Sequence, residues 1–238
     1  RTSVRWHKGS GKRIIIHNSF ICRNMETALD KYIRTHSDTP NPALEWVEKQ
    51  TNIKTNYPRM LSGAITGEIL TLIAKMCGAK HILEIGCFTG YSTICLAEGI
   101  EDKNGAVESL EINDELEELI LSGWEKAGVG HKAHLHIGDA LESIEKFARE
   151  GYKFDMVYID ANKREYLAYY RAVMPLLESG GVILADDTML GGKVYDTPDT
   201  SDKQTRGLIE FNEFVKNDAS VEVVMLPLRD GLSIIRKK

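Results

Sequence analysis

Apolar and polar positions along the chain follow two periods in turn, one typical of strands and one typical of helices. Runs of strand length occur at His81–Ile85, Ala106–Glu111, Ala133–Ile137, Phe154–Asp160, Gly181–Asp186, Val221–Leu226 and Leu232–Ile235. Helical patterns separate most of them, at Tyr91–Gly99, Asp114–Ala127, Ala140–Glu150, Arg164–Leu177 and Thr205–Lys216. Because strands that alternate with helices form βαβ units, the sequence predicts an α/β fold around a parallel sheet.

The two ends of the pattern depart from this alternation. The last two strands are joined by a short segment with Pro227 and the turn signal Asp230-Gly231, which is too short for a helical crossover. We therefore expect the last strand to run antiparallel, and residues 25–238 to form one domain. Three further helices are expected before the first strand, at Glu26–His36, Pro42–Lys54 and Ala64–Cys77.

The first 24 residues have a different character. They are basic and hold only one short apolar run, Ile14-Ile15-Ile16, whereas a signal peptide needs a longer apolar region and a small-residue cleavage site. We expect residues 1–24 to be an upstream extension outside the fold, with Met25 as a natural start.

Composition and charge limit the classes of function. The chain has 238 residues, 42% of them hydrophobic, and a net charge of −5, which gives no general attraction to nucleic acid or to anionic membranes. No apolar run approaches the length of a membrane span. The four cysteines, Cys22, Cys77, Cys87 and Cys95, show no metal-site spacing. We expect reduced thiols in a cytoplasmic protein.

The first predicted strand runs into a glycine loop, in the sequence HILEIGCFTGYS at residues 81–92. Gly86 and Gly90 permit tight turns and close approach of a ligand, and Ser92 can donate to that ligand. A dinucleotide fingerprint is missing, because Phe88 stands where its second glycine belongs. Glu111, which ends the next strand, can accept hydrogen bonds from both hydroxyls of a ribose. A ribose site without a pyrophosphate site indicates S-adenosylmethionine (SAM).

A third segment, Gly138-Asp139-Ala140, follows the next strand. Asp139 or the backbone of Ala140 can contact the edge of an adenine at this place. The alternative is that Asp139 is only the N-cap of the following helix, and on the sequence alone this alternative is favoured.

Acidic residues follow two strands that we expect to be neighbours. Asp160 ends one strand, and Asp186 and Asp187 end the next, after a single βαβ unit. Successive strand residues point to opposite faces, so Asp186 and Asp187 can share a target only where the strand has ended. Three converging carboxylates are typical of a site for Mg²⁺, with Mn²⁺ or Ca²⁺ as alternatives. For a single aspartate, the favoured alternative is a solvated strand end.

Lys163 follows Asp160 by three residues. It can pair with a carboxylate, or it can take a proton from a substrate hydroxyl. The sequence leaves both roles open.

Taken together, these motifs resemble the cation-dependent class I SAM O-methyltransferases, a family that includes catechol and caffeoyl-CoA O-methyltransferases and bacterial relatives. The resemblance covers nearly all of residues 25–238. It rests on LEIGCFTGYS, GDAL, YIDANKREYLAYY, GGVILADD, TRGLIEFN and LPLRDGLSIIRK, which occur in this order. It implies a Rossmann-like, doubly wound sheet of seven strands with an antiparallel last strand.

The resemblance also implies roles for single residues. It implies a divalent cation on Asp160, Asp186 and Asp187, with Lys163 as the base that frees an acceptor oxygen to attack the methyl group of SAM. It implies a small acceptor with two vicinal hydroxyls on an aromatic ring, and often a homodimer. The residues that it implies for cofactor binding are Met60, Ser62, Glu84, Gly86, Ser92, Glu111, Ala140 and Asp160.

Two positions depart from the family pattern, and two other functions stay open. Asn162 stands where many relatives carry an acid that contacts the cofactor, and Asp187 stands where relatives usually carry asparagine.

Some bacterial members of the family methylate a wobble hydroxyuridine of tRNA, so tRNA is an alternative acceptor. The other alternative is a nucleotide-binding module without chemistry, which the three acids disfavour.

Overall fold

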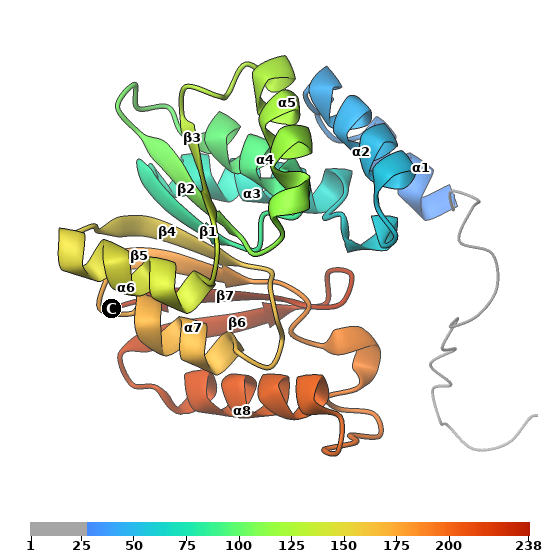
Figure 1. Cartoon of the computed structure of the whole chain (residues 1–238). Helices are drawn as coiled ribbons and strands as arrows, with labels where there is room; N and C mark the ends of the chain where they lie inside the picture. The colour runs from blue at the N-terminus through green and yellow to red at the C-terminus, as the bar shows by residue number, and fades with distance from the viewer. Residues whose placement is uncertain (1–27) are drawn as a thin grey trace, which may run out of the picture. The chain divides into compact units, whose positions relative to one another are not determined.

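The computed structural model describes residues 28–238 and contains one sheet of seven strands (Figure 1). The strand order is β3-β2-β1-β4-β5-β7-β6, and only β7 runs antiparallel to its neighbours. The predicted fold class is therefore confirmed. The strands are β1 (His81–Ile85), β2 (Ala106–Glu111), β3 (Ala133–Ile137), β4 (Phe154–Ile159), β5 (Leu177–Ala185), β6 (Val221–Leu226) and β7 (Leu232–Lys237).

The described chain divides into a short unit that ends at Asp38 and a main unit, Thr39–Lys238. The short unit holds α1 (Ala28–Thr35), and the boundary proposed at residue 24 lies outside the described residues. The helices of the main unit are α2 (Pro42–Lys54), α3 (Ala64–Cys77), α4 (Tyr91–Gly99), α5 (Glu117–Ala127), α6 (Ala140–Glu150), α7 (Tyr166–Val173) and α8 (Lys203–Asn217), with short 3₁₀ turns η1 (Pro58–Met60), η2 (Asp114–Leu116) and η3 (Leu190–Gly192).

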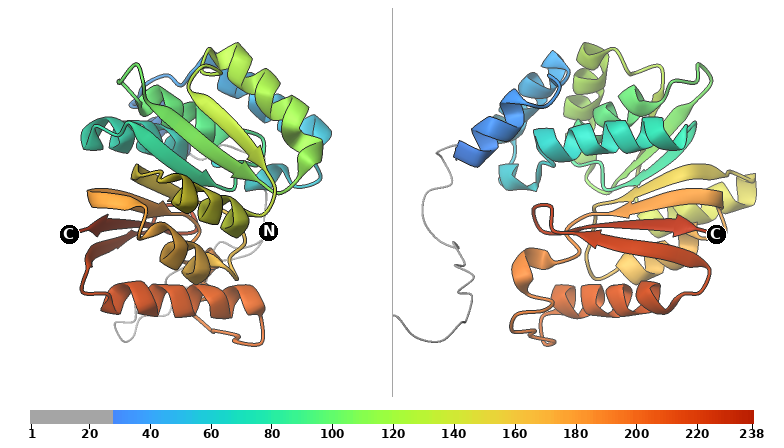
Figure 2. Two further views of the ribbon diagram at one scale, coloured as in Figure 1. Left: turned by 60° about the vertical axis from the view of Figure 1, so that its left-hand side comes forward. Right: turned by 180° about the vertical axis from the view of Figure 1, so that it is seen from behind.

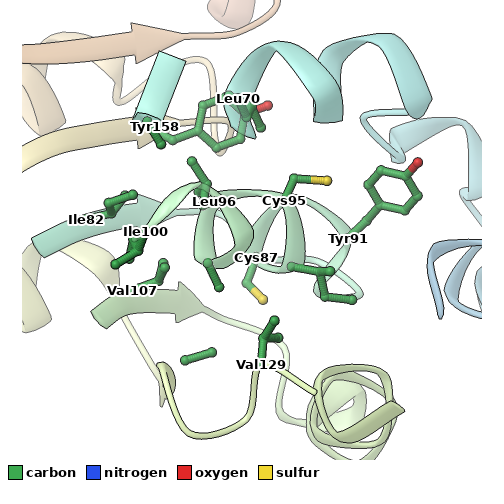
Figure 3. Close-up of a cluster of buried hydrophobic side chains, with 14 of the residues drawn as sticks. Leu70, Ile82, Cys87, Tyr91, Cys95, Leu96, Ile100, Val107, Val129 and Tyr158 are labelled. Atoms are coloured by element: carbon green, nitrogen blue, oxygen red, sulfur yellow. The ribbon is translucent and has the colours of Figure 1, made fainter. Parts of the chain in front are cut away.

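Helices cover both faces of the sheet in the main unit. Alternate strand residues point to opposite faces, so each strand supplies two cores. One core joins the sheet to α2, α3, α4 and α5, and the other joins it to α6, α7 and α8 (Figure 1). In the first core, Ile82 and Val107 from the sheet pack against Leu70 and Leu96 from the helices (Figure 3). The view from behind shows β6 and β7 side by side (Figure 2).

Several element boundaries differ from those predicted, and those of β4, β5 and α7 lie next to the site. Strand β5 begins at Leu177 instead of Gly181, because a bulge opposite Phe154 and Met156 lets the strand continue through the glycines. Helix α7 is correspondingly shorter than the predicted Arg164–Leu177, and Pro175, which has no backbone N–H, follows its end. Strands β4 and β5 end at Ile159 and Ala185, so the acidic residues lie in the turns after the strands.

No helix in the described part of the chain has the length and apolar character that crossing a membrane requires. Cys77, Cys87 and Cys95 are free thiols.

A carboxylate lies inside the sheet. Glu84 in β1 is fully buried, and its Oε2 accepts hydrogen bonds from the hydroxyls of Thr93 and Ser109. Its Oε1 has no hydrogen-bond partner among the described residues. Burial raises the pKa of Glu84 to about 7, although the hydroxyl donors act to lower it. A large share of the folded protein therefore carries a protonated Glu84 at neutral pH.

This raised pKa predicts a pH-dependent stability. Below pH 4.5 Glu84 is protonated in both states, and between pH 4.5 and 7 the unfolded chain loses this proton while the folded chain keeps it. The protonated Glu84 carboxyl thus makes its full contribution to stability below pH 4.5. About 3 kcal/mol of this contribution is lost as the pH rises from 4.5 through 7. Replacing Glu84 with Gln (Glu84→Gln) keeps an uncharged acceptor at every pH. Its stability relative to wild type should increase from pH 5 to pH 8 in urea unfolding.

Glu108 in the neighbouring strand gives a matched control. Its carboxylate accepts from His134 and His136, at 2.9 and 2.5 Å. Burial acts to raise the pKa of Glu108, but the hydrogen bonds from the two histidines bring it below its ordinary value. Glu108→Gln should therefore lose stability at neutral pH. Parallel pH profiles for wild type and Glu84→Gln would contradict the assignment of a buried, protonated Glu84.

Candidate functional site

A cavity of about 620 Å³ opens at the carboxyl ends of β1 and β4. The strand order reverses between these two strands, which is where open α/β sheets bind ligands. Most of the predicted site residues line this cavity. They are Met60, Ser62, Gly86, Ser92, Glu111, Ala140, Asp160, Lys163 and Asp187.

The glycine loop brings the chain after β1 against the chain after β4. Gly86 has a φ of +98°, and a Cβ atom at this position would overlap the carbonyl oxygen of Asp160. Only glycine fits this contact without a shift of the backbone. The Asp160 N–H donates to the carbonyl of Ile85 at 2.9 Å, which continues the pairing beyond the strands. Gly86 thus forms the tight turn that the sequence predicted, and its predicted approach to a ligand stays a prediction.

Glu111 is fixed in position by backbone donors. Its carboxylate accepts from the N–H of Phe88 at 2.6 Å and from the N–H of Asn113 at 3.0 Å. Burial raises the pKa of Glu111. The side chain lines the cavity beside the glycine loop, where the resemblance expects a ribose.

The segment before α6 has both of the features weighed in the sequence. The Asp139 carboxylate accepts from the N–H groups of Leu141 and Glu142, so it is an N-cap. Asp139 and Ala140 also line the cavity.

Lys163 lies between two of the predicted metal ligands. Its Nζ is 2.7 Å from Asp160 Oδ1 and 3.0 Å from Asp187 Oδ2. Burial acts to lower the pKa of Lys163, but Tyr166 and these two carboxylates raise it well above its ordinary value. Lys163 is therefore an ammonium group that neutralises part of the charge of Asp160, Asp186 and Asp187, which we call the acidic cluster.

Asp186 lies behind the wall of the cavity and is almost fully buried. Its Oδ2 accepts from the hydroxyl of Tyr158 at 2.9 Å, and its Oδ1 accepts from the N–H of Asp187. Burial, with the charges of Asp160 and Asp187, raises the pKa of Asp186 to about 6. The chain turns at this point, since Asp187 has a φ of +57°. The turn that the sequence required is thus present, but Asp187 lines the cavity and Asp186 does not, so a shared target for all three aspartates stays a prediction.

Two buried tyrosines hold the acidic cluster, and neither was predicted from the sequence. Tyr158 in β4 bonds the Asp186 carboxylate. Tyr166 in α7 accepts from Lys163 at 2.8 Å and donates to the backbone carbonyl of Asp186 at 2.9 Å. No local signal distinguishes them, because a tyrosine in a buried strand or helix is typical of an ordinary core.

The donor chemistry of the cluster fits a hard divalent cation. The hydrogen bonds of the described residues engage one oxygen of Asp160, and the ion pair with Lys163 engages one oxygen of Asp187. The second oxygen of each carboxylate remains for a ligand. Within residues 28–238, however, no three His, Cys, Asp or Glu side chains are already arranged as a metal site.

Glu84 is the predicted cofactor residue that the structure separates from the cavity. It lies in the interior of the sheet, where it accepts a hydrogen bond from Thr93 of α4, and it does not line the cavity. Asn162 lines the cavity, as does Leu190 from the loop after β5. Tyr195 of that loop is exposed to solvent. Residues that also line the cavity and were not predicted include Glu165, Tyr169 and Gln204.

Comparison with known sequences identifies relatives along most of the chain. The family model described as O-methyltransferase matches residues 34–238. A caffeoyl-CoA O-methyltransferase from Petroselinum crispum is 32% identical over 219 residues, which cover 88% of this chain and 90% of that protein. The caffeoyl-CoA O-methyltransferase from Eucalyptus gunnii is 33% identical, with 88% and 87% covered.

Solved structures agree with these relatives. The O-methyltransferase TomG from Streptomyces achromogenes, solved in complex with SAM, has a TM-score of 0.84 and 30% identity over 90% of this chain and 97% of its own. An O-methyltransferase from Bacillus cereus, solved with S-adenosylhomocysteine (SAH), has a TM-score of 0.83 and 29% identity, with 90% and 98% covered. A nucleotide-binding module without chemistry is therefore rejected. The chain belongs to the O-methyltransferase family and is a SAM-dependent O-methyltransferase.

Proposed function

We propose that this protein transfers the methyl group of SAM to a hydroxyl oxygen of a small, catechol-like acceptor in a reaction that depends on a divalent cation. One observation carries the proposal. Asp160, Lys163 and Asp187 line the same cavity as the glycine loop and Glu111, so the acidic cluster faces the space that the cofactor would occupy.

The transfer has a simple balance of bonds. The bond from the acceptor oxygen to the methyl carbon forms as the bond from that carbon to the cofactor sulfur breaks. The acceptor loses its hydroxyl proton, and the sulfonium becomes the neutral thioether of SAH. The contribution of the protein is positioning and charge, because the cavity holds both reactants in one orientation.

The residues of the acidic cluster have distinct roles in this proposal. Asp160, Asp186 and Asp187 would hold the cation through carboxylate oxygens, and Mg²⁺ suits them best, with Mn²⁺ or Ca²⁺ as alternatives. A bound cation supplies charge that lowers the pKa of an acceptor hydroxyl. Lys163 keeps Asp160 and Asp187 in place through its ion pairs. Positive charge brought to these carboxylates lowers the pKa of Lys163, which a role as base requires.

The charges around the cavity favour a small acceptor over tRNA. A tRNA acceptor would need basic residues around the mouth of the site, and the candidates in the sequence are Lys163, Arg164, Arg171, Lys193, Lys203 and Arg206. Lys163 lies inside the cavity and is held by carboxylates. Lys193 and Arg206 are near acidic partners, Asp202 and Glu210, and Arg171 stacks on Phe214. The cavity wall itself carries five carboxylates, which repel an anion. They are Glu111, Asp139, Asp160, Glu165 and Asp187.

Two further expectations belong to this proposal and remain predictions. They are the formation of a homodimer, which the family resemblance suggests, and a cytoplasmic location, which the four cysteines favour.

A methyl-transfer screen with and without EDTA tests the proposed reaction. We expect SAH to form with catechol and with dopamine, to form more slowly with 3,4-dihydroxybenzoate because its carboxylate meets the acidic wall, and to stop in EDTA until Mg²⁺ is restored. Bulk tRNA serves as the competing acceptor. Activity on tRNA alone would refute the small acceptor, and full activity in EDTA would refute the need for a cation.

The acidic residue at position 187 predicts a metal affinity that calorimetry can measure. Asp187→Asn removes one carboxylate from the cluster, and the dissociation constant for Mg²⁺ should rise by about tenfold, equivalent to about 1.4 kcal/mol. Asp139→Asn is the matched control, because it removes a carboxylate from the same cavity and keeps the N-cap. Equal affinities in wild type and Asp187→Asn would show that Asp187 does not bind the cation.

A further inference from the structure

The turn between β6 and β7 contains a residue in an unfavourable backbone conformation. Arg229 has a φ of +48°, in the left-handed region that favours glycine. A residue with a Cβ atom in this region costs about 1–2 kcal/mol. Strain of this kind persists where the surrounding contacts compensate for it, so the side chain of Arg229 needs a structural explanation.

The Arg229 side chain reaches the segment that connects α2 to α3. We call residues 57–63, from Tyr57 to Gly63, the strap. Nη1 of Arg229 donates to the carbonyl of Leu61 at 3.0 Å and to the carbonyl of Ser62. Leu61 and Ser62 both line the cavity. A charged guanidinium thus bonds the backbone of one cavity wall, and such bonds are stronger than those between neutral groups.

The same turn holds the opposite wall of the cavity. The carbonyl of Asp230 accepts from the N–H of Met189 at 2.7 Å, and the carbonyl of Gly231 accepts from the N–H of Thr188 at 3.0 Å. A Cβ atom on Gly231 would overlap Met189, so the two segments are in direct contact. Thr188 and Met189 directly follow Asp187, which belongs to the acidic cluster. The turn therefore bonds the strap on one side and the loop after β5 on the other.

The end of the strap is buried at the cavity wall. Ser62 is buried and lines the cavity together with Leu61. A displacement of Ser62 would therefore change the shape of the cavity wall. Gly63, with a φ of +79°, ends the strap immediately before α3, and the Arg229 side chain lies next to it.

We propose that Arg229 is a positioning residue that fastens the strap to the β6–β7 turn and so fixes Leu61 and Ser62 against the bound cofactor. This inference rests on SAM occupying the cavity. Arg229 does not touch the reacting atoms in this proposal. It acts through the two carbonyl groups that it bonds, and its strained backbone is the cost of directing the guanidinium to them.

Calorimetry with SAH on the full chain tests the proposal through two substitutions that act differently on stability. Arg229→Ala removes the guanidinium and keeps the backbone strain, whereas Arg229→Gly removes both. Both should weaken SAH binding by about tenfold, as expected for hydrogen bonds from a charged donor. Arg229→Gly should melt at a higher temperature than Arg229→Ala, which separates weaker binding from a loss of folding. Arg229→Lys keeps one charged donor and should restore part of the affinity.

Hydrogen exchange supplies a local measurement that a general stabilising role would not change. We expect faster exchange at residues 57–63 in both Arg229→Ala and Arg229→Gly, without a change in β1 or β4. Arg236→Ala is the control, since Arg236 in the same hairpin pairs with Glu222 and should leave SAH affinity within about twofold.

The outcomes separate this inference from the proposed function. SAH affinity within twofold of wild type in both Arg229→Ala and Arg229→Gly would overturn the role of Arg229 and leave the cofactor site intact. Failure of the wild-type protein to bind SAH would overturn the cofactor assignment and this inference with it. Weaker binding, faster exchange in the strap and partial recovery in Arg229→Lys would together support the inference.

Discussion

The contact between the chain after β1 and the chain after β4 is the constraint on which the site depends. Gly86 approaches Asp160 so closely that a single added carbon would overlap the Asp160 carbonyl. This contact follows from the strand order, which places β1 beside β4 and sends their connecting helices to opposite faces. The glycine loop and the acidic cluster share one cavity because of it. A wider separation of the two strand ends would make them two unrelated surfaces.

The second constraint is that the negative charge of buried carboxylates has to be offset. The protein does this in different ways in the interior of the sheet and at the cavity. Among the described residues, no cationic side chain pairs with Glu84, and burial favours its protonated form. Asp160 and Asp187 lie at the cavity and share the ammonium of Lys163. Asp186 lies between these cases, because it accepts from Tyr158 and its pKa is raised only to about 6. Negative charge is thus offset by protonation at Glu84, by an ammonium group at Asp160 and Asp187, and by a hydroxyl donor at Asp186.

The sequence predicted the features that depend on local pattern. The central strands and the turn at Gly86 follow from periodicity, glycine positions and the geometry of βαβ units. The same geometry predicted that Asp160, Asp186 and Asp187 converge, and of these Asp160 and Asp187 line the cavity, whereas Asp186 does not. The predicted start of β5 was wrong, because the bulge in β5 depends on pairing with Phe154, which lies in β4. The ion pairs of Lys163 were foreseen as one of two roles, but the sequence could not choose between them.

Residues that act across long separations along the chain could not be found in this way. Tyr158, Tyr166 and Arg229 each have an ordinary local context, and their partners are fixed only when the sheet has formed. Arg229 bonds carbonyls that precede it by more than 160 positions along the chain. The structure marks Arg229 as unusual through its φ of +48°. Nothing in the sequence around Arg229 predicts this backbone conformation.

Asp187 illustrates how conformation and charge can be separated at one position. Its φ of +57° lies in the left-handed region, where aspartate and asparagine are both enriched among residues other than glycine. The turn after β5 therefore accepts either residue without a difference in backbone strain. What distinguishes them is the ion pair with Lys163, which only a carboxylate can form. The effect of aspartate at this position is thus electrostatic. The Asp187 carboxylate adds an ion pair with Lys163 and makes the acidic cluster more attractive to cations.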